Sequence, residues 1–210
     1  MGLFGFGKSK IDKRKKDWII ESVDWCNKGN ALAKLGKDEE AIECYDKAVS
    51  LDSTNGRAWS NKGNAMTKLG KDEETIVCCS QAIRLNPEDL RAWSNKGNAL
   101  AKLGKDEEAI ECYDKAVSLD STNGRAWSNK GNAMTKLGKD EETIVCCSQA
   151  IRLNPEDLRA WSNKGNALAK LGKDEEAIEC YNQVIRFNSK DPNAWFNRGN
   201  SLANLKKFEE

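Results

Sequence analysis

A period of 34 residues constrains this chain more than any other feature. Tryptophan recurs at that spacing along the whole chain, at Trp25, Trp59, Trp93, Trp127, Trp161 and Trp195. A fixed period of about 20 to 50 residues is typical of arrays in which each unit buries its apolar face by stacking on its neighbours. The sequence therefore predicts a repeat array.

A second period of 68 residues lies over the first. The stretch 27–113 is identical, residue for residue, to the stretch 95–181. Odd and even repeats thus form a duplicated pair. Either a recent tandem duplication or an engineered gene produces such identity.

Each repeat has the pattern of two helices. In residues 90–104, LRAWSNKGNALAKLG, apolar or small side chains fall on one helical stripe, and Gly104 suits a left-handed helix end. In residues 105–120, KDEEAIECYDKAVSLD, acidic residues come first, which favours a helix N-terminus there. In the even repeats, Asn86-Pro87 and Asn154-Pro155 predict the end of the second helix.

The repeat resembles that of the tetratricopeptide repeat family. The first-helix pattern W-x2-K-G-x2-[LM] is met by Trp93, Gly97 and Leu100, and the second-helix pattern A-x3-[FY] by Ala109 and Tyr113. The resemblance implies an all-α solenoid of antiparallel helical hairpins that forms a right-handed superhelix. It implies structural roles for the six tryptophans above and for one glycine per repeat, namely Gly29, Gly63, Gly97, Gly131, Gly165 and Gly199.

The resemblance divides the chain into a leader and an array. We expect a basic leader with a capping helix at 1–21, five full repeats at 22–55, 56–89, 90–123, 124–157 and 158–191, and a partial sixth at 192–210. Because the sixth lacks a second helix, the chain is either a fragment or one that pairs with a second copy through this end.

Composition excludes several function classes. Histidine is absent, which excludes imidazole catalysis and histidine-containing zinc sites. No apolar run approaches the roughly 18 residues of a membrane span, and no signal peptide is recognisable. We therefore expect a cytoplasmic, non-enzymatic protein without a metal or cofactor, whose eight cysteines are reduced and mainly serve as small core residues.

The resemblance also predicts a binding surface, because first helices line the concave face in this family. The predicted binding residues form four columns: Arg57, Arg91, Arg125 and Arg159; Asn61, Asn95, Asn129 and Asn163; Asn64, Asn98, Asn132 and Asn166; and Lys68, Lys102, Lys136 and Lys170. Helical spacing agrees, since Arg91, Asn95 and Asn98 are separated by four and three residues.

The chemistry of these columns predicts the partner. Asparagine offers a donor and an acceptor to a peptide backbone, and arginine binds carboxylates. We expect an extended, acidic peptide or protein segment, with ordinary solvated helix faces as the alternative. Two other functions stay open: an architectural array that assembles with itself, and a nucleic-acid-binding solenoid, which is not expected because the groove lacks aromatic residues for base stacking.

Two further features lie outside these columns. Cys26 is expected to face the groove and to be more reactive than the other cysteines. The leader has six basic and two acidic residues up to Asp17, which predicts weak contact with an anionic membrane, while Trp18, Ile19 and Ile20 predict a short helix that covers the first repeat.

Overall fold

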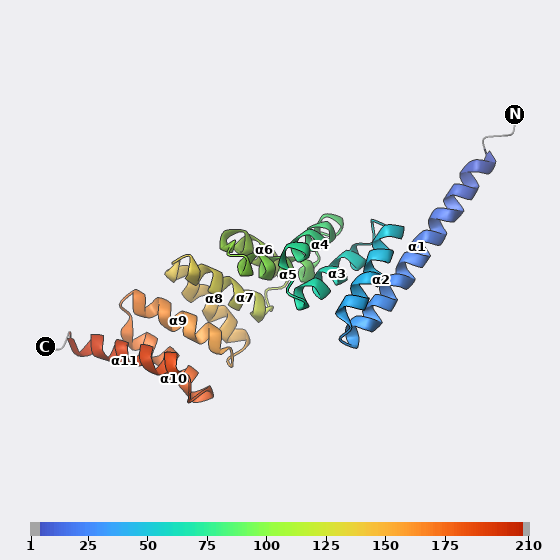
Figure 1. The fold of residues 1–210 in the computed structure, drawn as a ribbon. Helices are drawn as coiled ribbons and strands as arrows, with labels where there is room; N and C mark the ends of the chain where they lie inside the picture. Colours follow the sequence, from blue (N-terminus) through green and yellow to red (C-terminus); the bar gives the residue numbers. More distant parts are fainter. Residues whose placement is uncertain (1–4, 208–210) are drawn as a thin grey trace. The chain divides into compact units, whose positions relative to one another are not determined.

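The computed structural model describes the backbone of residues 5–207 and the side chains of residues 14–206. This part of the chain is all-α, as predicted (Figure 1). Its helices are α1 (Gly5–Lys34), α2 (Asp38–Leu51), α3 (Gly56–Lys68), α4 (Asp72–Leu85), α5 (Leu90–Lys102), α6 (Asp106–Leu119), α7 (Gly124–Lys136), α8 (Asp140–Leu153), α9 (Leu158–Lys170), α10 (Asp174–Phe187) and α11 (Pro192–Lys207).

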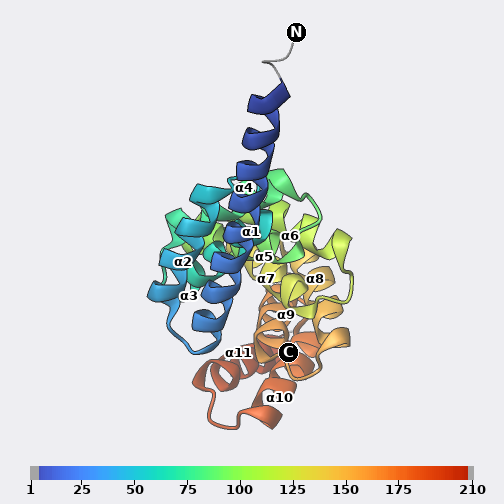
Figure 2. The ribbon, with the colours of Figure 1, turned by 90° about the vertical axis from the view of Figure 1, so that its right-hand side faces the viewer.

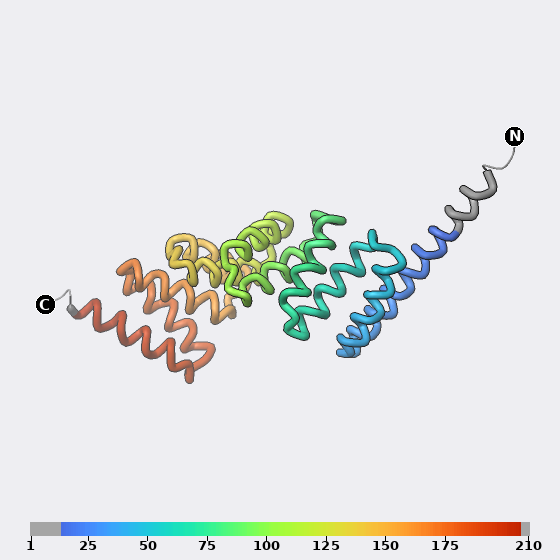
Figure 3. The backbone as a smooth tube through the Cα atoms, turned by 45° about the horizontal axis from the view of Figure 1, so that its top comes forward, coloured from blue at the N-terminus to red at the C-terminus, as the bar shows by residue number. Residues whose placement is uncertain are grey.

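Contacts divide the chain into two units, Met1–Leu103 and Gly104–Glu210, called unit 1 and unit 2 below. In unit 1 the helices α1 to α5 pack in sequence, and α3 also packs on α1 and α5. In unit 2 the helices α6 to α11 pack in the same way, with α9 between α7 and α11. Figures 2 and 3 let the reader follow the successive hairpins of each unit by colour. The boundary falls between the two helices of the repeat at 90–123.

Glycine and proline end the helices where the sequence predicts. After α3, Gly70 has a φ of 70°, a left-handed conformation that glycine adopts without strain. The backbone N–H of Lys71 then donates to the carbonyl of Met66 at 3.0 Å and closes the helix end. Helix α4 ends at Leu85, directly before Asn86-Pro87.

A glycine in each first helix lets the second helix approach closely. A Cβ atom at Gly29 would lie 2.6 Å from Cε1 of Tyr45, whose ring is buried. In the following even repeat a Cβ at Gly63 would lie 2.6 Å from Sγ of Cys79. The glycine is therefore a packing requirement in both kinds of repeat, whereas a Cβ at Gly199 of the last repeat would meet no described atom within 4 Å.

The tryptophans hold the turns that precede their helices. Trp59 is half-buried, and its indole N–H donates to the carbonyl of Ser53 at 3.1 Å. Corresponding bonds run from Trp93 to Pro87, from Trp127 to Ser121, from Trp161 to Pro155 and from Trp195 to Ser189. Lys62, which precedes Gly63, lies with its Nζ 5.6 Å from the centre of the Trp59 ring.

The N-terminal segment differs from the expected separate capping helix. Helix α1 runs without a break from Gly5 to Lys34, through residue 21. Trp18, Ile19 and Ile20 are exposed, but Trp18 and Ile19 line a hollow together with residues 51–54 of the first repeat, so the covering of that repeat stays a prediction. The contact with an anionic membrane stays a prediction. None of the helices in the described residues has the length and apolar character needed to cross a membrane.

Helix α11 has one packed and one open face. Ala194 and Ser201 are buried, whereas Trp195 and Phe196 are exposed. The pairing of two copies through this helix stays a prediction.

Candidate functional site

Unit 1 contains a groove with a volume of about 980 Å³. Helix α3 contributes more lining residues than any other helix. The rest come from α1, Tyr45 of α2, Thr54 before α3, Leu85 at the end of α4, the loop before α5 and the first turn of α5. Five of the predicted binding residues line it, namely Arg57, Asn61, Asn64, Lys68 and Arg91. The prediction omitted Asn30, Lys34 and Tyr45, although Asn30 and Lys34 stand one period before Asn64 and Lys68.

The two asparagine columns bond to each other across neighbouring first helices. Nδ2 of Asn61 on α3 donates to Oδ1 of Asn30 on α1 at 2.7 Å. The same bond runs from Asn95 to Asn64 at 3.4 Å, from Asn163 to Asn132 at 3.4 Å and from Asn197 to Asn166 at 3.0 Å. These amides therefore join consecutive repeats, a role that the sequence analysis missed.

Protein donors already occupy the side-chain amide oxygens of two asparagines in the groove of unit 1. Arg91 donates through Nη1 to Oδ1 of Asn61 at 3.0 Å, and Tyr45 donates through its hydroxyl to Oδ1 of Asn30 at 2.9 Å. Both amide oxygens are thus occupied by protein donors. Arg91 keeps further N–H groups for a ligand. The groove consequently offers more donors than acceptors to a ligand.

The lysine column is largely neutralised by aspartates. Lys68 lies with its Nζ 2.9 Å from Oδ1 of Asp38, which opens α2 and is buried. The other pairs join Lys102 to Asp72 at 3.3 Å, Lys136 to Asp106 at 3.1 Å and Lys170 to Asp140 at 3.4 Å. In the same place of the last repeat, Asn204 donates to Asp174 at 3.4 Å. The positive charge of the groove therefore depends mainly on its arginines.

Replacing Lys68 by alanine is expected to lower the free energy of unfolding by about 0.5 to 1 kcal/mol. The lysine is half-exposed and its attraction is screened, but its loss leaves the buried carboxylate of Asp38 with one partner fewer. Urea denaturation followed by far-UV circular dichroism measures the change. Lys34, one repeat earlier in the same column, has no ion pair among the described residues and provides the matched alanine control. An equal decrease in the free energy of unfolding of the Lys68→Ala and Lys34→Ala variants would show that the ion pair between Lys68 and Asp38 does not stabilise the fold.

The arginines of the columns differ from the equally exposed lysines because no ion pair with an aspartate is found for them among the described residues. Arg57, at the start of α3, is exposed and forms no hydrogen bond or ion pair with another described residue. Arg91 is also exposed, so its free N–H groups are accessible. On α5, Asn95 is buried and Asn98 half-buried. The usable charge in unit 1 is thus carried by Arg57, by Arg91 and by Lys34, which also lines the groove.

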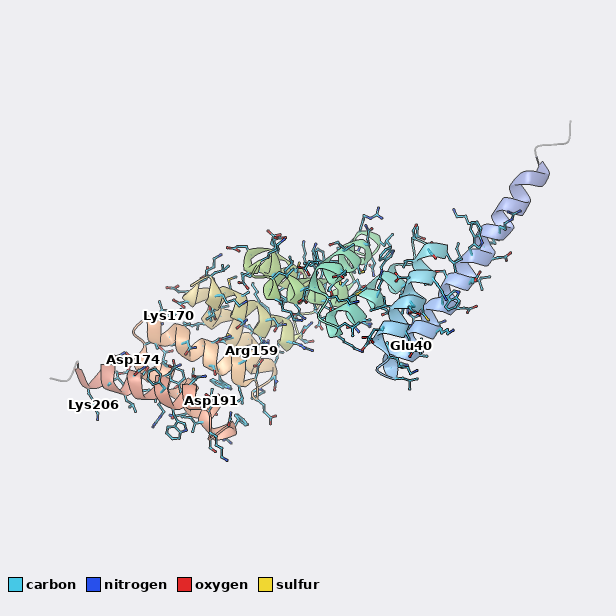
Figure 4. All side chains as sticks on the ribbon, in the orientation of Figure 1. Glu40, Arg159, Lys170, Asp174, Asp191 and Lys206 are labelled. Carbon is cyan, nitrogen blue, oxygen red and sulfur yellow. The ribbon has the colours of Figure 1, made fainter. Side chains whose placement is uncertain are left out.

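The predicted binding residues of unit 2 lie on its first helices, as those of unit 1 do. Helix α7 carries Arg125, Asn129, Asn132 and Lys136, and α9 carries Arg159, Asn163, Asn166 and Lys170. Arg125 and Arg159 are exposed, and Arg159 donates to Oδ1 of Asn129. Figure 4 labels Arg159 and Lys170 on α9 and Asp174, which opens the next helix.

The cysteines have no part in the groove. All eight are buried and form no disulfide. The expectation that Cys26 faces the groove and is reactive is wrong: it lies in the core of unit 1, and burial raises the pKa of its thiol. Within the described residues, no group of three or more cysteine, aspartate or glutamate side chains is placed to hold a metal ion.

Comparisons with known proteins agree with this architecture. The family model described as TPR repeat matches five overlapping stretches, at residues 29–70, 63–104, 97–138, 131–172 and 165–206. No curated protein sequence matches the chain.

Three solved structures show how far the likeness extends. The crystal structure of YrrB, described as a TPR protein with an unusual peptide-binding site, has a TM-score of 0.79 and 22% identity, covering 94% of this chain and all of that one. A crystal structure of MamA has a TM-score of 0.74 and 19% identity, covering 81% of this chain and 93% of that one. MamA 41-end from Desulfovibrio magneticus RS-1 has a TM-score of 0.73 and 20% identity, covering 81% and 97%. At these identities the likeness shows the fold alone.

Proposed function

The chain belongs to the tetratricopeptide repeat family, and we propose that it is a non-catalytic interaction scaffold whose groove in unit 1 binds an extended, acidic peptide segment. The family match and the described peptide-binding site of the similar YrrB support peptide binding in general. The acidic character of the segment is inferred from the chemistry of the groove.

The observation on which this proposal depends is the excess of donors in the groove. Oδ1 of Asn30 and Oδ1 of Asn61 already accept protein hydrogen bonds, whereas Arg57 and Arg91 present exposed guanidinium groups. A ligand in this groove must therefore supply acceptors. Backbone carbonyls and carboxylates do so, and a carboxylate gains the strength of a charge-assisted hydrogen bond.

Acidic groups at the rim limit where the ligand carboxylates bind. Glu88 and Asp89 line the groove next to Arg91, and Oδ1 of Asp89 is used by the backbone N–H of Ala92 as a helix cap. We therefore expect the carboxylates to bind beside Arg57 and Arg91 rather than at the rim.

The test uses a fluorescent peptide of alternating aspartate and glutamate whose two termini are blocked. The neutral control is the same peptide with asparagine in place of aspartate and glutamine in place of glutamate. Replacing both Arg57 and Arg91 by alanine is expected to weaken binding of the acidic peptide about a hundredfold, since a hydrogen bond to a charged group contributes about 1.5 to 3 kcal/mol. Fluorescence anisotropy measures the affinity.

A control variant separates this effect from net charge. Arg84 lies on α4 outside the groove lining, is exposed and donates to Gln81 at 3.0 Å, so its change to alanine also removes a positive charge from unit 1. We expect that variant to bind like the parent. Equal loss in the Arg84→Ala variant, or no loss in the double variant, would refute the assignment of the groove.

A further inference from the structure

The groove of unit 1 lies entirely within the duplicated part of the sequence. Its lining begins at Asn30 and ends at Arg91, and the stretch 27–113 recurs unchanged at 95–181. Every lining residue therefore has an identical counterpart 68 residues later.

Most of those counterparts lie inside unit 2. The lining residues of α3, of the loop before α5 and of the first turn of α5 correspond to residues of α7, of the loop before α9 and of the first turn of α9. Those on which the comparison below depends are Arg125, Asn129, Lys136, Asp157 and Arg159.

The contacts within unit 2 repeat those of unit 1. Arg159 donates to Asn129 as Arg91 donates to Asn61. Lys136 pairs with Asp106 at 3.1 Å as Lys68 pairs with Asp38 at 2.9 Å.

The loops and cations correspond as well. Asp157 caps α9 through the N–H of Ala160 at 3.0 Å, as Asp89 caps α5. Arg125 is exposed at the start of α7, as Arg57 is at the start of α3. The two arginines, the amide to which Arg159 donates and the capping aspartate thus recur in the second unit, while the counterparts of Asn30 and Lys34 lie on α5 of unit 1.

The period of the site is 68 residues rather than 34. In the odd repeat, Tyr45 donates to Oδ1 of Asn30 and fixes the orientation of that amide. One repeat later the equivalent of Tyr45 is Cys79, which has no phenolic hydroxyl, and Asn64 receives Nδ2 of Asn95 at the longer distance of 3.4 Å. Successive repeats are therefore chemically different, and the tyrosine–asparagine bond recurs in an odd repeat of unit 2, where the hydroxyl of Tyr181 donates to Oδ1 of Asn166 at 3.0 Å.

We infer that unit 2 contains a second site for the same acidic segment, so that one chain binds two copies of it. This inference rests on the proposed function of the groove in unit 1. The inference predicts a partner in which one acidic motif occurs at least twice. A ligand whose two motifs reach both sites of one chain binds more tightly than a ligand with a single motif, because its second binding step is intramolecular.

Isothermal titration of the full chain with the blocked aspartate and glutamate peptide measures the number of sites. We expect two peptides per chain with one common affinity. Arg57→Glu is expected to leave one site, Arg125→Glu is expected to leave one site of the same affinity, and the double variant is expected to leave none. Because both arginines are exposed, unchanged thermal unfolding would show that the variants are folded.

Matched controls come from the same duplication. Arg84→Glu and Arg152→Glu introduce the same charge change at equivalent positions outside the groove lining, and both should retain two sites. One peptide per chain in the parent, or loss of all binding in the Arg57→Glu variant alone, would overturn the second site and leave the proposed function standing. Absence of any binding to the parent would overturn both.

Discussion

Replacing Tyr45 by alanine is expected to destabilise unit 1 by about 3 to 5 kcal/mol, the usual loss for a buried aromatic side chain. Only 1% of the Tyr45 surface is exposed, and its ring lies in a core with Ile42, Ala48 and Cys26. The ring also packs directly on the backbone of α1 at Gly29, where a side chain would collide with it. Its removal therefore leaves a cavity between α1 and α2 that neither helix has a side chain to fill. Urea denaturation followed by circular dichroism measures this loss.

Two further substitutions at the same position separate the ring from its hydroxyl. Tyr45→Phe keeps the packing and removes only the bond to Asn30, so we expect a loss of about 0.5 to 1.5 kcal/mol. Tyr45→Cys introduces the residue that the even repeat has at the equivalent position, Cys79. We expect its loss of stability to lie between those of Tyr45→Phe and Tyr45→Ala. If Tyr45→Phe were as destabilising as Tyr45→Ala, the packing explanation would be wrong.

The helical hairpins could be predicted because their signals are local. The left-handed glycine after each first helix, the acidic first turn of each second helix and the proline after α4 each act within a few residues of the helix end that they specify. An array repeats these signals, so that Gly70 and Gly104, for example, end α3 and α5 in the same conformation. Contacts between neighbours in sequence then determine most of the packing.

The use of the groove residues could not be predicted in the same way. The sequence placed Asn61 and Lys68 on one helix face, but their partners Asn30 and Asp38 stand about one repeat earlier on other helices. Which residues meet there depends on the register between repeats, and the pattern of a single helix does not contain that register. The bonds reduce the number of free groups and concentrate the available charge at the arginines.

Cys26 illustrates the same limit. It occupies the position that serine has in Ser60 and Ser94, and it was expected to face the groove. In the structure Cys26 is buried and is not part of the groove lining, whereas Ser60 lines the groove although it is also buried. A helical wheel alone does not distinguish a groove-facing position from one that faces the next repeat.

Buried thiols are expected to make unit 2 strongly sensitive to alkaline pH. Burial raises the pKa of Cys147 to about 12 and that of Cys180 to about 11, from an ordinary value of 9.0. In the unfolded chain these thiols ionise near pH 9, whereas in the folded chain they stay protonated. The folded state therefore binds more protons above pH 9, and stability must fall as pH rises through this range.

The expected loss is large because the two thiols act together. Ionisation of each thiol in the unfolded chain lowers the free energy of unfolding by about 1.4 kcal/mol per pH unit between its unfolded and folded pKa values, so the sum at pH 11 is on the order of 5 kcal/mol. The raised pKa of Tyr181, about 12, extends the loss above pH 10. Below pH 9 the contribution of all three groups is complete and the stability of unit 2 does not depend on them.

Urea midpoints measured from pH 8 to pH 11 under reducing conditions test this expectation. In a Cys147→Ala, Cys180→Ala variant the starting stability is lower, since two core side chains are shortened, but its decline between pH 9 and pH 11 should be much shallower than in the parent. The comparison of slopes separates the thiols from every other group that titrates in this range, because those groups are shared by both proteins. If the stability of the parent and of the variant fell equally between pH 9 and pH 11, the thiols of Cys147 and Cys180 would ionise in the folded state as easily as in the unfolded state. Their burial argues against that outcome, because a buried thiolate loses its hydration.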